Sequence, residues 1–259
     1  MAVRARDGWA GWDDYAAFYD WENAQTVQRR DVRFWQRLAA AADGRILELG
    51  CGTGRILVPV AKSGVGLVGI DRSASMLTRA RRRIARARLD ATARLVRGDI
   101  RVLPFPGRAF NLVMAPYGIL QSLVRPSDLT AALESIARVL PKGGRVGIDL
   151  VPDLPRWSEY RDRKTLSGPM GRDARVTLVE SVRQDRPRRL TTFDQRYVIE
   201  RGGRRHVSCF SLTFRTVSVP RMSSLLERAG FRVDAVLGDY QGGPWDERAD
   251  VWVILASRR

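Results

Sequence analysis

The sequence is poor in cysteine and histidine. Its 259 residues include two cysteines, Cys51 and Cys209, and a single histidine, His206. The two cysteines form neither a disulfide framework nor the ligand spacing of a zinc site, and one histidine cannot complete such a site alone. We therefore expect no bound metal and no metal-assisted catalysis through these residue types.

The sequence also lacks a long apolar run. No stretch approaches the roughly 18 consecutive apolar residues that a membrane-spanning helix needs. Asp7, Asp13 and Asp14 stand near the start, where a signal peptide would be apolar. We therefore expect a soluble, cytoplasmic protein without a membrane partner. The 44% of hydrophobic residues are enough for one substantial core with an added insertion.

Lysine is almost absent. Of the 45 basic residues only Lys62, Lys142 and Lys164 are lysines, and the net charge is +17. A charge of this size suits a nucleic acid, a membrane surface or an acidic substrate as partner. A GC-rich coding background would give the same arginine skew, and we favour that explanation. The arginines between Arg79 and Arg88 are expected to form the solvated face of an amphipathic helix.

From residue 45 onward, short apolar runs alternate with helical patterns, which predicts an α/β fold with a parallel sheet and helices on both faces. The expected strands are residues 46–49, 65–70, 93–96, 112–115, 145–150, 231–237 and 251–256. The expected helices are residues 73–87, 127–140 and 220–229. A further helical pattern passes through Val32, Trp35 and Leu38 ahead of the first strand.

The pattern changes after the fifth predicted strand. Residues 175–182, 189–200 and 206–217 are rich in β-forming residues and are separated by turn-like segments, which predicts an inserted antiparallel meander. We therefore divide the chain into three parts. Residues 1–43 form a helical, aromatic lid segment, residues 44–150 and 219–259 a cofactor-binding domain, and residues 151–218 an inserted substrate-side subdomain.

The strongest local signal is the segment ILELGCGTGR at residues 46–55. An apolar strand breaks there into a turn with alternate glycines, so that a ligand can approach the backbone without meeting a Cβ atom. A dinucleotide site would share this feature, but its usual third glycine stands where this chain has Arg55, and Glu48 would repel a pyrophosphate. The turn therefore predicts a cationic, amino-acid-like ligand, with a plain tight turn as the alternative.

Two further acidic residues follow predicted strands. Asp71 ends the second strand beside the glycine turn, where its carboxylate can accept two hydrogen bonds from ribose hydroxyls. Asp99 ends the third strand, where it could accept a hydrogen bond from an adenine amino group while Ile100 and Met76 cover the faces of the ring. An ordinary aspartate at the start of a helix and an Asx-turn are the alternatives.

These motifs, followed by FNLV at 110–113 and LPKGG at 140–144, resemble those of class I S-adenosylmethionine-dependent methyltransferases, which have a Rossmann-like, mostly parallel seven-stranded sheet. The resemblance is close over residues 45–150 and implies S-adenosylmethionine as the cofactor. It implies that Gly50 and Gly52 line the methionine moiety and that Ala115 to Tyr117 flank the sulfonium. The full set expected at the cofactor is Tyr15, Tyr19, Glu48, Gly50, Cys51, Gly52, Asp71, Arg72, Met76, Asp99, Ile100, Ala115 and Tyr117.

Three other segments narrow the resemblance. The opening YAAFYD at 15–20, the inserted meander and the loop GDYQGGPW at 238–245 look like those of bacterial small-molecule methyltransferases, a group that includes sugar N- and glycine-type N-methyltransferases. In those relatives the segment after the fourth strand often carries Gln-His, whereas this chain has Gln121 and Ser122. The difference removes a candidate base.

The expected function is methyl transfer by in-line displacement to a nitrogen or oxygen of a small molecule. Tyr19, Tyr117 and His206 are the candidate catalytic residues, although a lone histidine on a strand is more often an ordinary residue. Tyr15 to Trp21 are expected to form a lid, with packing on the domain edge as the alternative. An RNA or protein methyltransferase and a cofactor-binding protein without transfer activity stay open, as do a monomer and a homodimer. No specific nucleic-acid partner is expected.

Overall fold

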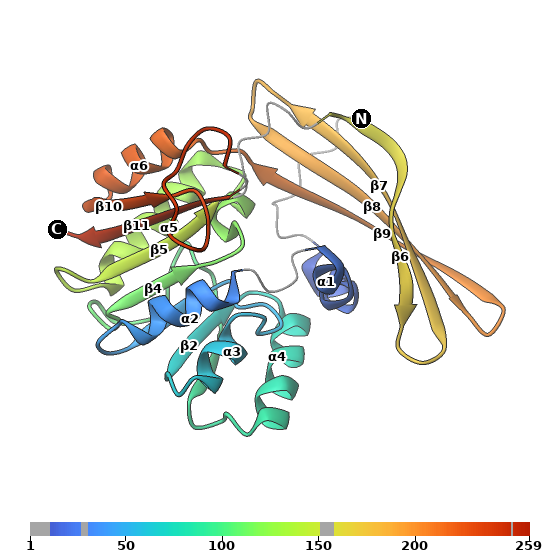
Figure 1. Cartoon of the computed structure of the whole chain (residues 1–259), viewed down its shortest axis with the longest axis horizontal. Helices are drawn as coiled ribbons and strands as arrows, with labels where there is room; N and C mark the ends of the chain where they lie inside the picture. Colours follow the sequence, from blue (N-terminus) through green and yellow to red (C-terminus); the bar gives the residue numbers. More distant parts are fainter. Residues whose placement is uncertain (1–10, 27–30, 151–157, 250) are drawn as a thin grey trace.

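The computed structural model describes residues 11–26, 31–150, 158–249 and 251–259, and these residues form two sheets (Figure 1). The larger sheet has seven strands in the order β10-β11-β5-β4-β1-β2-β3, and the smaller has four in the order β6-β7-β8-β9. The strands are β1 Ile46–Leu49, β2 Leu67–Asp71, β3 Ala93–Arg97, β4 Leu112–Ala115, β5 Arg145–Leu150, β6 Tyr160–Met170, β7 Ala174–Asp185, β8 Leu190–Arg201, β9 Arg204–Arg215, β10 Phe231–Leu237 and β11 Trp252–Arg258.

The seven-stranded sheet is parallel except at one edge. β1 pairs in parallel with both β2 and β4, whereas β11 runs antiparallel to β5 and to β10. The strand order therefore reverses between β1 and β4, which is where doubly wound sheets open a crevice at the carboxyl ends of their strands. The predicted Rossmann-like, mostly parallel sheet with an inserted antiparallel sheet is confirmed.

Helices cover both faces of this sheet, with α2, α3 and α4 on one side and α5 and α6 on the other (Figure 1). Alternate strand residues serve the two layers: Leu47 packs in the core under α5 and α6, while Ile46 packs with Trp35 under α2 and α3. None of the described helices is long and apolar enough to cross a membrane. The helices are α1 Trp12–Thr26, α2 Val32–Ala40, α3 Leu57–Lys62, α4 Ala74–Ala87, α5 Pro126–Val139 and α6 Val219–Arg228, with a 3-10 turn, η1, at Ile119–Ser122.

Helix α4 begins where the sequence predicts it, because Ser73 caps it by accepting a hydrogen bond from the Met76 N–H at 3.0 Å. The expected solvated arginine face is only partly correct. Arg81 and Arg82 are exposed, but Arg83 forms a 2.9 Å ion pair with Asp20 of α1. This arginine thus ties α4 to the N-terminal helix instead of facing solvent alone.

The inserted sheet has one strand more than predicted. Three β-rich segments were expected, and β6 was missed because residues 160–164, Tyr-Arg-Asp-Arg-Lys, carry no alternation of apolar and polar side chains. The burial pattern explains this composition. β6 is an edge strand whose first half is mostly exposed, so it needs no apolar face there.

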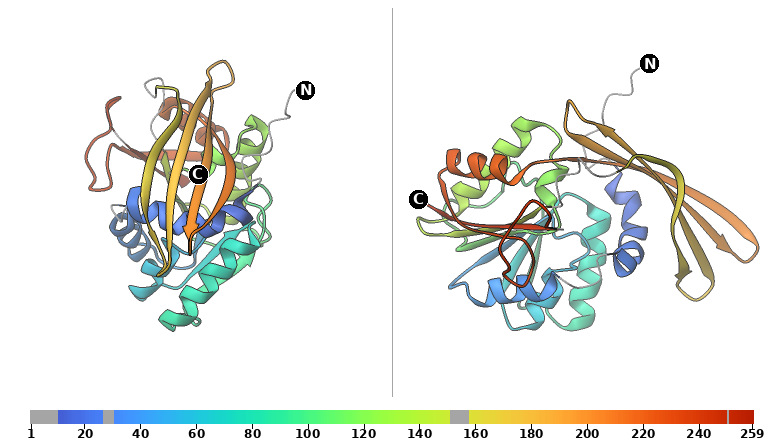
Figure 2. Two further views of the ribbon diagram at one scale, coloured as in Figure 1. Left: turned by 90° about the vertical axis from the view of Figure 1, so that its right-hand side faces the viewer. Right: turned by 45° about the horizontal axis from the view of Figure 1, so that its top comes forward.

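Helix α1 lies between the two sheets (Figure 2). Its Phe18 stacks on Tyr197 of β8 with ring centroids 4.3 Å apart, and Tyr15 meets Phe210 of β9 edge-on at 5.7 Å. Together with Val176 and Leu178 these side chains form a third core, separate from the two cores of the large sheet. The aromatic N-terminal segment therefore holds the inserted sheet against the rest of the molecule.

One glycine of β2 sets how closely the turn after β1 can approach the sheet. A Cβ atom on Gly69 would lie 2.4 Å from Leu57 Cδ1 and 2.7 Å from Cys51 Sγ, both of which are buried. By contrast, a Cβ atom on Gly66, just before the same strand, would have Thr92 O at 3.8 Å as its nearest neighbour. Only the first position is closed to a side chain.

We expect Gly69→Ala to lower the free energy of unfolding by about 1–3 kcal/mol, the usual cost of overpacking a core. Gly66→Ala is the matched control and should change it by no more than about 0.5 kcal/mol. Urea denaturation of both variants measures the difference. Equal stability of the two variants would contradict the close approach at Gly69.

Candidate active site

A cavity of about 1040 Å³ lies at the crevice of the large sheet. Its walls come from the turn after β1, the ends of β2 and β4, helix α1 and the inner face of the inserted sheet. Residues from distant parts of the sequence therefore face one another across it. Most of the predicted cofactor residues line this cavity: Tyr15, Tyr19, Glu48, Gly50, Cys51, Gly52, Asp71, Arg72, Met76, Asp99, Ile100 and Tyr117.

The turn after β1 is left-handed at alternate residues. Gly50 and Gly52 have φ angles of 59° and 53°, a conformation that a side chain would strain. A Cβ atom on Gly52 would meet nothing closer than 3.8 Å, so the backbone here faces open space. The turn thus offers bare backbone to a ligand, as the sequence predicts.

Asp71 joins this turn to β2 and to α4. Its Oδ2 accepts a hydrogen bond from the Gly52 N–H at 2.9 Å, and its Oδ1 accepts one from the Ser73 N–H at 2.8 Å. Burial raises the pKa of Asp71, and these backbone donors oppose the rise. Each carboxylate oxygen keeps a second lone pair that can accept a hydrogen bond from a ribose hydroxyl.

Glu48 is buried at the end of β1, and its Oε2 has no hydrogen-bond partner among the described residues. Burial raises the pKa of its carboxyl well above the usual range, and nearby Arg55 opposes the rise. Arg55 is itself held by Asp31 through two hydrogen bonds of 2.8 and 2.6 Å, and its guanidinium lies 4.9 Å from the centre of the Tyr117 ring. A cationic group of a ligand would satisfy the free oxygen of Glu48.

Asp99 stands in a network that the sequence did not reveal. Its carboxylate forms ion pairs with Arg101 at 2.7 Å and Arg72 at 3.0 Å, and Arg101 also reaches Asp128 at 3.2 Å. The arginine hydrogen bonds hold the pKa of Asp99 below its usual value against a burial effect that raises it. A nucleobase at this position would share the carboxylate with two guanidinium groups.

Two residues that were predicted at the site, Ala115 and His206, do not line the cavity. Ala115 is fully buried in the core between the sheet and α5, so its side chain faces away from the open space. His206 is exposed on β9, six residues from Leu212, which lines the cavity. At about 3.3 Å per strand residue, this spacing places the histidine about 20 Å along the strand from that wall.

The half of the cavity under the inserted sheet is walled mainly by apolar side chains. This wall is formed by Ile119, Leu123, Phe193, Leu212 and Phe214. Two carboxylates that sequence reasoning missed, Glu22 and Glu180, also line it.

These carboxylates are bridged by an amide. The Gln195 side chain donates to Glu180 Oε2 at 3.0 Å and to Glu22 Oε1 at 3.4 Å. The hydroxyls of Tyr15 and Tyr197 both donate to Glu22 Oε2. Burial raises the pKa of Glu22, and the tyrosine hydrogen bonds oppose the rise.

Neither carboxylate forms an ion pair with a described arginine, lysine or histidine. Arg163 stands opposite Glu180 in register, yet it is exposed and its guanidinium lies over the Tyr160 ring at 5.6 Å. The sequence held one usable signal for this cluster. Tyr15, Phe18 and Glu22 follow the i, i+3, i+7 spacing of a single helix face, so a half-buried, inward-facing Glu22 could have been predicted.

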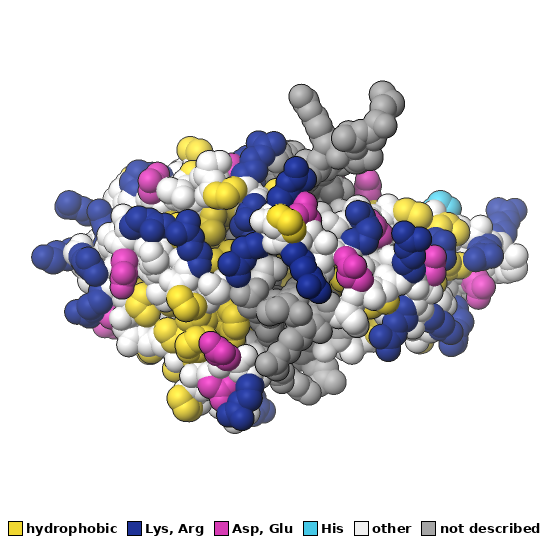
Figure 3. All heavy atoms as spheres, turned by 90° about the horizontal axis from the view of Figure 1, so that it is seen from above, with side chains coloured by type: hydrophobic (Ala, Val, Ile, Leu, Met, Phe, Trp, Pro, Cys, Tyr) yellow, Lys and Arg dark blue, Asp and Glu magenta, His cyan; other side chains and the backbone are white. Residues whose placement is uncertain are grey.

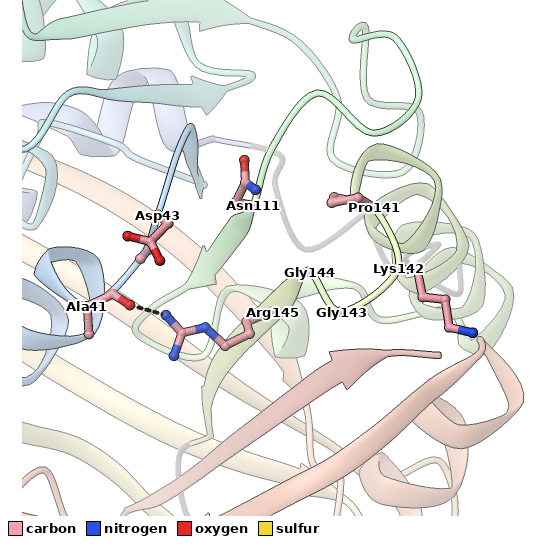
Figure 4. A pocket seen from close by; sticks show the side chains of 9 residues that line it. Ala41, Asp43, Asn111, Pro141, Lys142, Gly143, Gly144 and Arg145 are labelled. Atoms are coloured by element: carbon pink, nitrogen blue, oxygen red, sulfur yellow. Dashed lines mark hydrogen bonds between the residues drawn. The ribbon is translucent and has the colours of Figure 1, made fainter.

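A second, smaller hollow lies at the amino ends of the parallel strands (Figure 4). Asp43, Asn111 and Lys142 surround it, and the Arg145 guanidinium donates a hydrogen bond to the Ala41 carbonyl. Ligands of doubly wound sheets bind at the carboxyl ends of the strands. The crevice beside the glycine turn, at the opposite edge, is therefore the candidate active site.

Sequence comparison places the site in a known family. Residues 46–144 match the model of a methyltransferase domain. The chain is 27% identical over 228 residues to a cypemycin N-terminal methyltransferase of Streptomyces, covering 87% of this chain and 88% of the relative. It is 34% identical over 189 residues to a demethylmenaquinone methyltransferase of Paenarthrobacter aurescens, covering 66% of this chain and 69% of the relative.

Solved structures show the same fold. The CcbJ methyltransferase of Streptomyces caelestis superposes with a TM-score of 0.72 at 21% identity, covering 88% of this chain and 95% of that one. The sugar N-methyltransferase KedS8 of Streptoalloteichus superposes with a TM-score of 0.75 at 19% identity, covering 93% and 92%. Both likenesses extend over the inserted sheet as well as the large one, given their coverage.

A doubly wound sheet with an open glycine turn and an acidic residue in or just after the last two positions of each of its first three strands defines a binder of a nucleoside-containing cofactor. The chain belongs to the class I S-adenosylmethionine-dependent methyltransferases, and S-adenosylmethionine is its cofactor. The residues present fit this group. The unpartnered Glu48 oxygen suits its ammonium, and the open backbone at Gly52 leaves room for it beside Asp71.

We expect Asp71→Ala to weaken the binding of S-adenosylhomocysteine by about 1–3 kcal/mol, because charge-assisted hydrogen bonds to the ribose are lost. The exposed Asp90, just after α4, provides the control Asp90→Asn, which should bind as the wild type does. Isothermal titration calorimetry measures both. Unchanged affinity of the Asp71 variant would remove this residue from the cofactor site.

Proposed function

We propose that the protein transfers the methyl group of S-adenosylmethionine to a small-molecule acceptor held between α1 and the inserted sheet. The observation that carries this proposal is the shape of the cavity, which continues from the glycine turn into a half walled by Phe193, Leu212 and other apolar side chains. Such an enclosed half suits a small acceptor and keeps water from the reacting atoms. A protein that only bound the cofactor would have no use for it.

Methyl transfer requires the acceptor atom, the methyl carbon and the sulfur to lie in line. Tyr19 and Tyr117 both line the cavity, with ring centroids 6.5 Å apart. We propose that they stand where its donor and acceptor halves meet. Burial raises the pKa of Tyr19 to about 12 and also raises that of Tyr117. Both hydroxyls therefore stay protonated at neutral pH and can orient an acceptor by hydrogen bonding, without serving as bases.

The acceptor atom is proposed to be an amine nitrogen. Glu22 and Glu180 line the acceptor half without any ion-pair partner among the described residues, so they favour a proton-donating group such as an amine N–H. The neutral amine attacks the methyl carbon with its lone pair as the bond from carbon to sulfur breaks, and the proton that the nitrogen then loses can pass to a carboxylate or to solvent. Arg215 also lines the cavity, but its guanidinium donates to the Val124 and Arg188 carbonyls, so the two carboxylates still disfavour a phenolate or carboxylate. The proposal agrees with the N-methyltransferases among the similar proteins, which carry that activity in their names.

The rival RNA methyltransferase is supported by charge alone. Arg81, Arg82 and Arg86 of α4 are exposed, and none of them lines the cavity. On the face seen from above, basic side chains lie among acidic and hydrophobic ones and do not form a single stripe (Figure 3). We therefore propose no specific nucleic-acid partner.

The proposal also covers the location of the enzyme, its oligomeric state and the role of α1. We propose a cytoplasmic location, because a reducing compartment suits the two free cysteines, Cys51 and Cys209. A monomer or a homodimer is consistent with a site that one chain completes. We also propose that α1 acts as a lid, since Tyr15 and Tyr19 cover the cavity from this helix.

We expect Glu22→Gln to raise KM for amine acceptors by about tenfold with little change for neutral hydroxyl acceptors, because one charge of the carboxylate pair is lost. A panel of apolar amines and phenols, assayed with radiolabelled methyl donor, measures this. Glu227→Gln, at an exposed site on α6, is the control and should behave as the wild type does. A preference for phenols in the wild type would overturn the amine assignment.

We expect RNA and duplex DNA to bind only weakly, with affinity lost at about 150–200 mM salt, because counterion release accounts for purely electrostatic binding. Filter binding across a salt series, beside methyl incorporation into RNA, tests this. Sub-micromolar RNA affinity that persists at that salt concentration, together with RNA methylation, would favour the RNA enzyme instead.

A further inference from the structure

Two consecutive residues in the turn after β4 are left-handed. Tyr117 has a φ angle of 59° and Gly118 one of 61°. Glycine adopts this conformation freely, but a tyrosine there is strained because its Cβ atom crowds the backbone. Such a conformation persists only where surrounding contacts hold it. The Tyr117 ring lies against Arg55 in the cavity wall. The contacts that hold the turn therefore also fix the position of this ring in the wall.

The contact that holds the turn is the carboxylate of Asp149. Its Oδ1 accepts a hydrogen bond from the Gly118 N–H at 2.7 Å, and the Tyr117 N–H also donates to this carboxylate. Asp149 lies near the carboxyl end of β5, one residue beyond the Ile148 that pairs with Ala115 of β4. Its side chain is only 1% exposed. The side chain of Asp149, on the strand next to β4, thus binds the strained turn directly.

The other carboxylate oxygen binds a third segment. Asp149 Oδ2 accepts a hydrogen bond from the Tyr240 hydroxyl at 2.8 Å, and Tyr240 belongs to the loop between β10 and β11. The same tyrosine packs on Phe34 at 5.8 Å, and its carbonyl accepts a hydrogen bond from the Arg37 guanidinium. One carboxylate therefore connects the β4 turn, the C-terminal loop and α2.

We propose that Asp149 is a positioning residue, which fixes the Tyr117 ring at the boundary between the donor and acceptor halves of the cavity by binding the Gly118 N–H and the Tyr240 hydroxyl. This inference rests on the proposed place of the methyl donor beside Tyr117. An ionised carboxylate accepts from all of these donors, whereas a protonated one must donate from one oxygen. The position of the turn is thus coupled to the ionisation of a single side chain.

The surroundings of Asp149 place this ionisation near neutrality. Burial raises its pKa to about 6, while hydrogen bonds from Tyr117, Gly118 and Tyr240 oppose the rise and the charge of Asp31 adds to it. Arg55 lies across the Tyr117 ring and forms its ion pair with Asp31. The ionised Asp149 carboxylate should therefore hold the turn fully at pH 8, and its protonation should release the turn as the pH falls below about 6.

The affinity for S-adenosylhomocysteine, measured by calorimetry from pH 5 to 8, tests the proposal without any acceptor, so it fails or succeeds independently of the acceptor assignment. We expect Asp149→Asn to bind about tenfold more weakly than the wild type at pH 8, the usual effect of losing a charge-assisted hydrogen bond. We also expect the wild type to lose that advantage below about pH 6. Glu48 and Asp71 titrate in both proteins, so the difference between the two profiles isolates Asp149.

Tyr240→Phe is the second variant, because it removes one donor and leaves Asp149 in place. Loss of a hydrogen bond to the charged form should raise the pKa of Asp149, so the loss of affinity should begin at a higher pH than in the wild type. A profile for Asp149→Asn that matches the wild type would overturn the proposal. So would lowered melting temperatures in both variants with unchanged affinity profiles, because that result would make the residue purely structural.

Discussion

The hydrogen bond from the Gly52 N–H to Asp71 is the contact on which the rest of the site depends. It joins the turn after β1 to the end of β2, and the second oxygen of the same carboxylate joins both to the start of α4. Close packing of Gly69 against Cys51 lets the two strands come near enough for this contact. Without it, the turn would be held only by backbone hydrogen bonds such as the one from the Cys51 N–H to the Ile70 carbonyl, and its glycines favour no single conformation by themselves.

Carboxylates bound by hydrogen-bond donors occur at several places around the cavity. Asp149 is buried, Asp71 and Glu22 are half-buried, and each of the three is bound by backbone N–H or hydroxyl donors rather than by a described cation. Arginines pair instead with the buried Asp31 and with Asp99. Hydrogen-bond donors have fixed directions, so each of the three carboxylates determines the geometry of the turn or helix that it binds. In a chain of net charge +17, the cavity is lined by seven acidic side chains and five arginines.

The parts of the fold and site that the sequence predicted are those with local signals. The glycine turn, the Ser73 cap and the acidic ends of β2 and β3 are each readable within a few residues, and the alternation of strands and helices predicted the sheet. Strand β6 was not predicted because its exposed, charged first half lacks the alternation of apolar and polar side chains. The Glu22 and Asp149 clusters join residues far apart in the chain, 175 positions for Glu22 and Tyr197 and 91 for Asp149 and Tyr240. No pattern within one segment encodes such pairs.

The raised pKa of Asp149 lowers the stability of the folded protein at neutral pH. The pKa of Asp149 in the folded protein, about 6, exceeds its ordinary value of 3.8, so the contribution of this group to stability is fully present below the lower value and is lost as the pH rises through the higher one. At neutral pH the difference amounts to about 3 kcal/mol against folding, on the order of one pKa unit per 1.4 kcal/mol. Fold stability alone would favour a neutral residue at this position. Against this cost, the carboxylate holds the strained Tyr117 turn at the wall of the cavity and joins it to the C-terminal loop, so its charge serves the site as well as the fold.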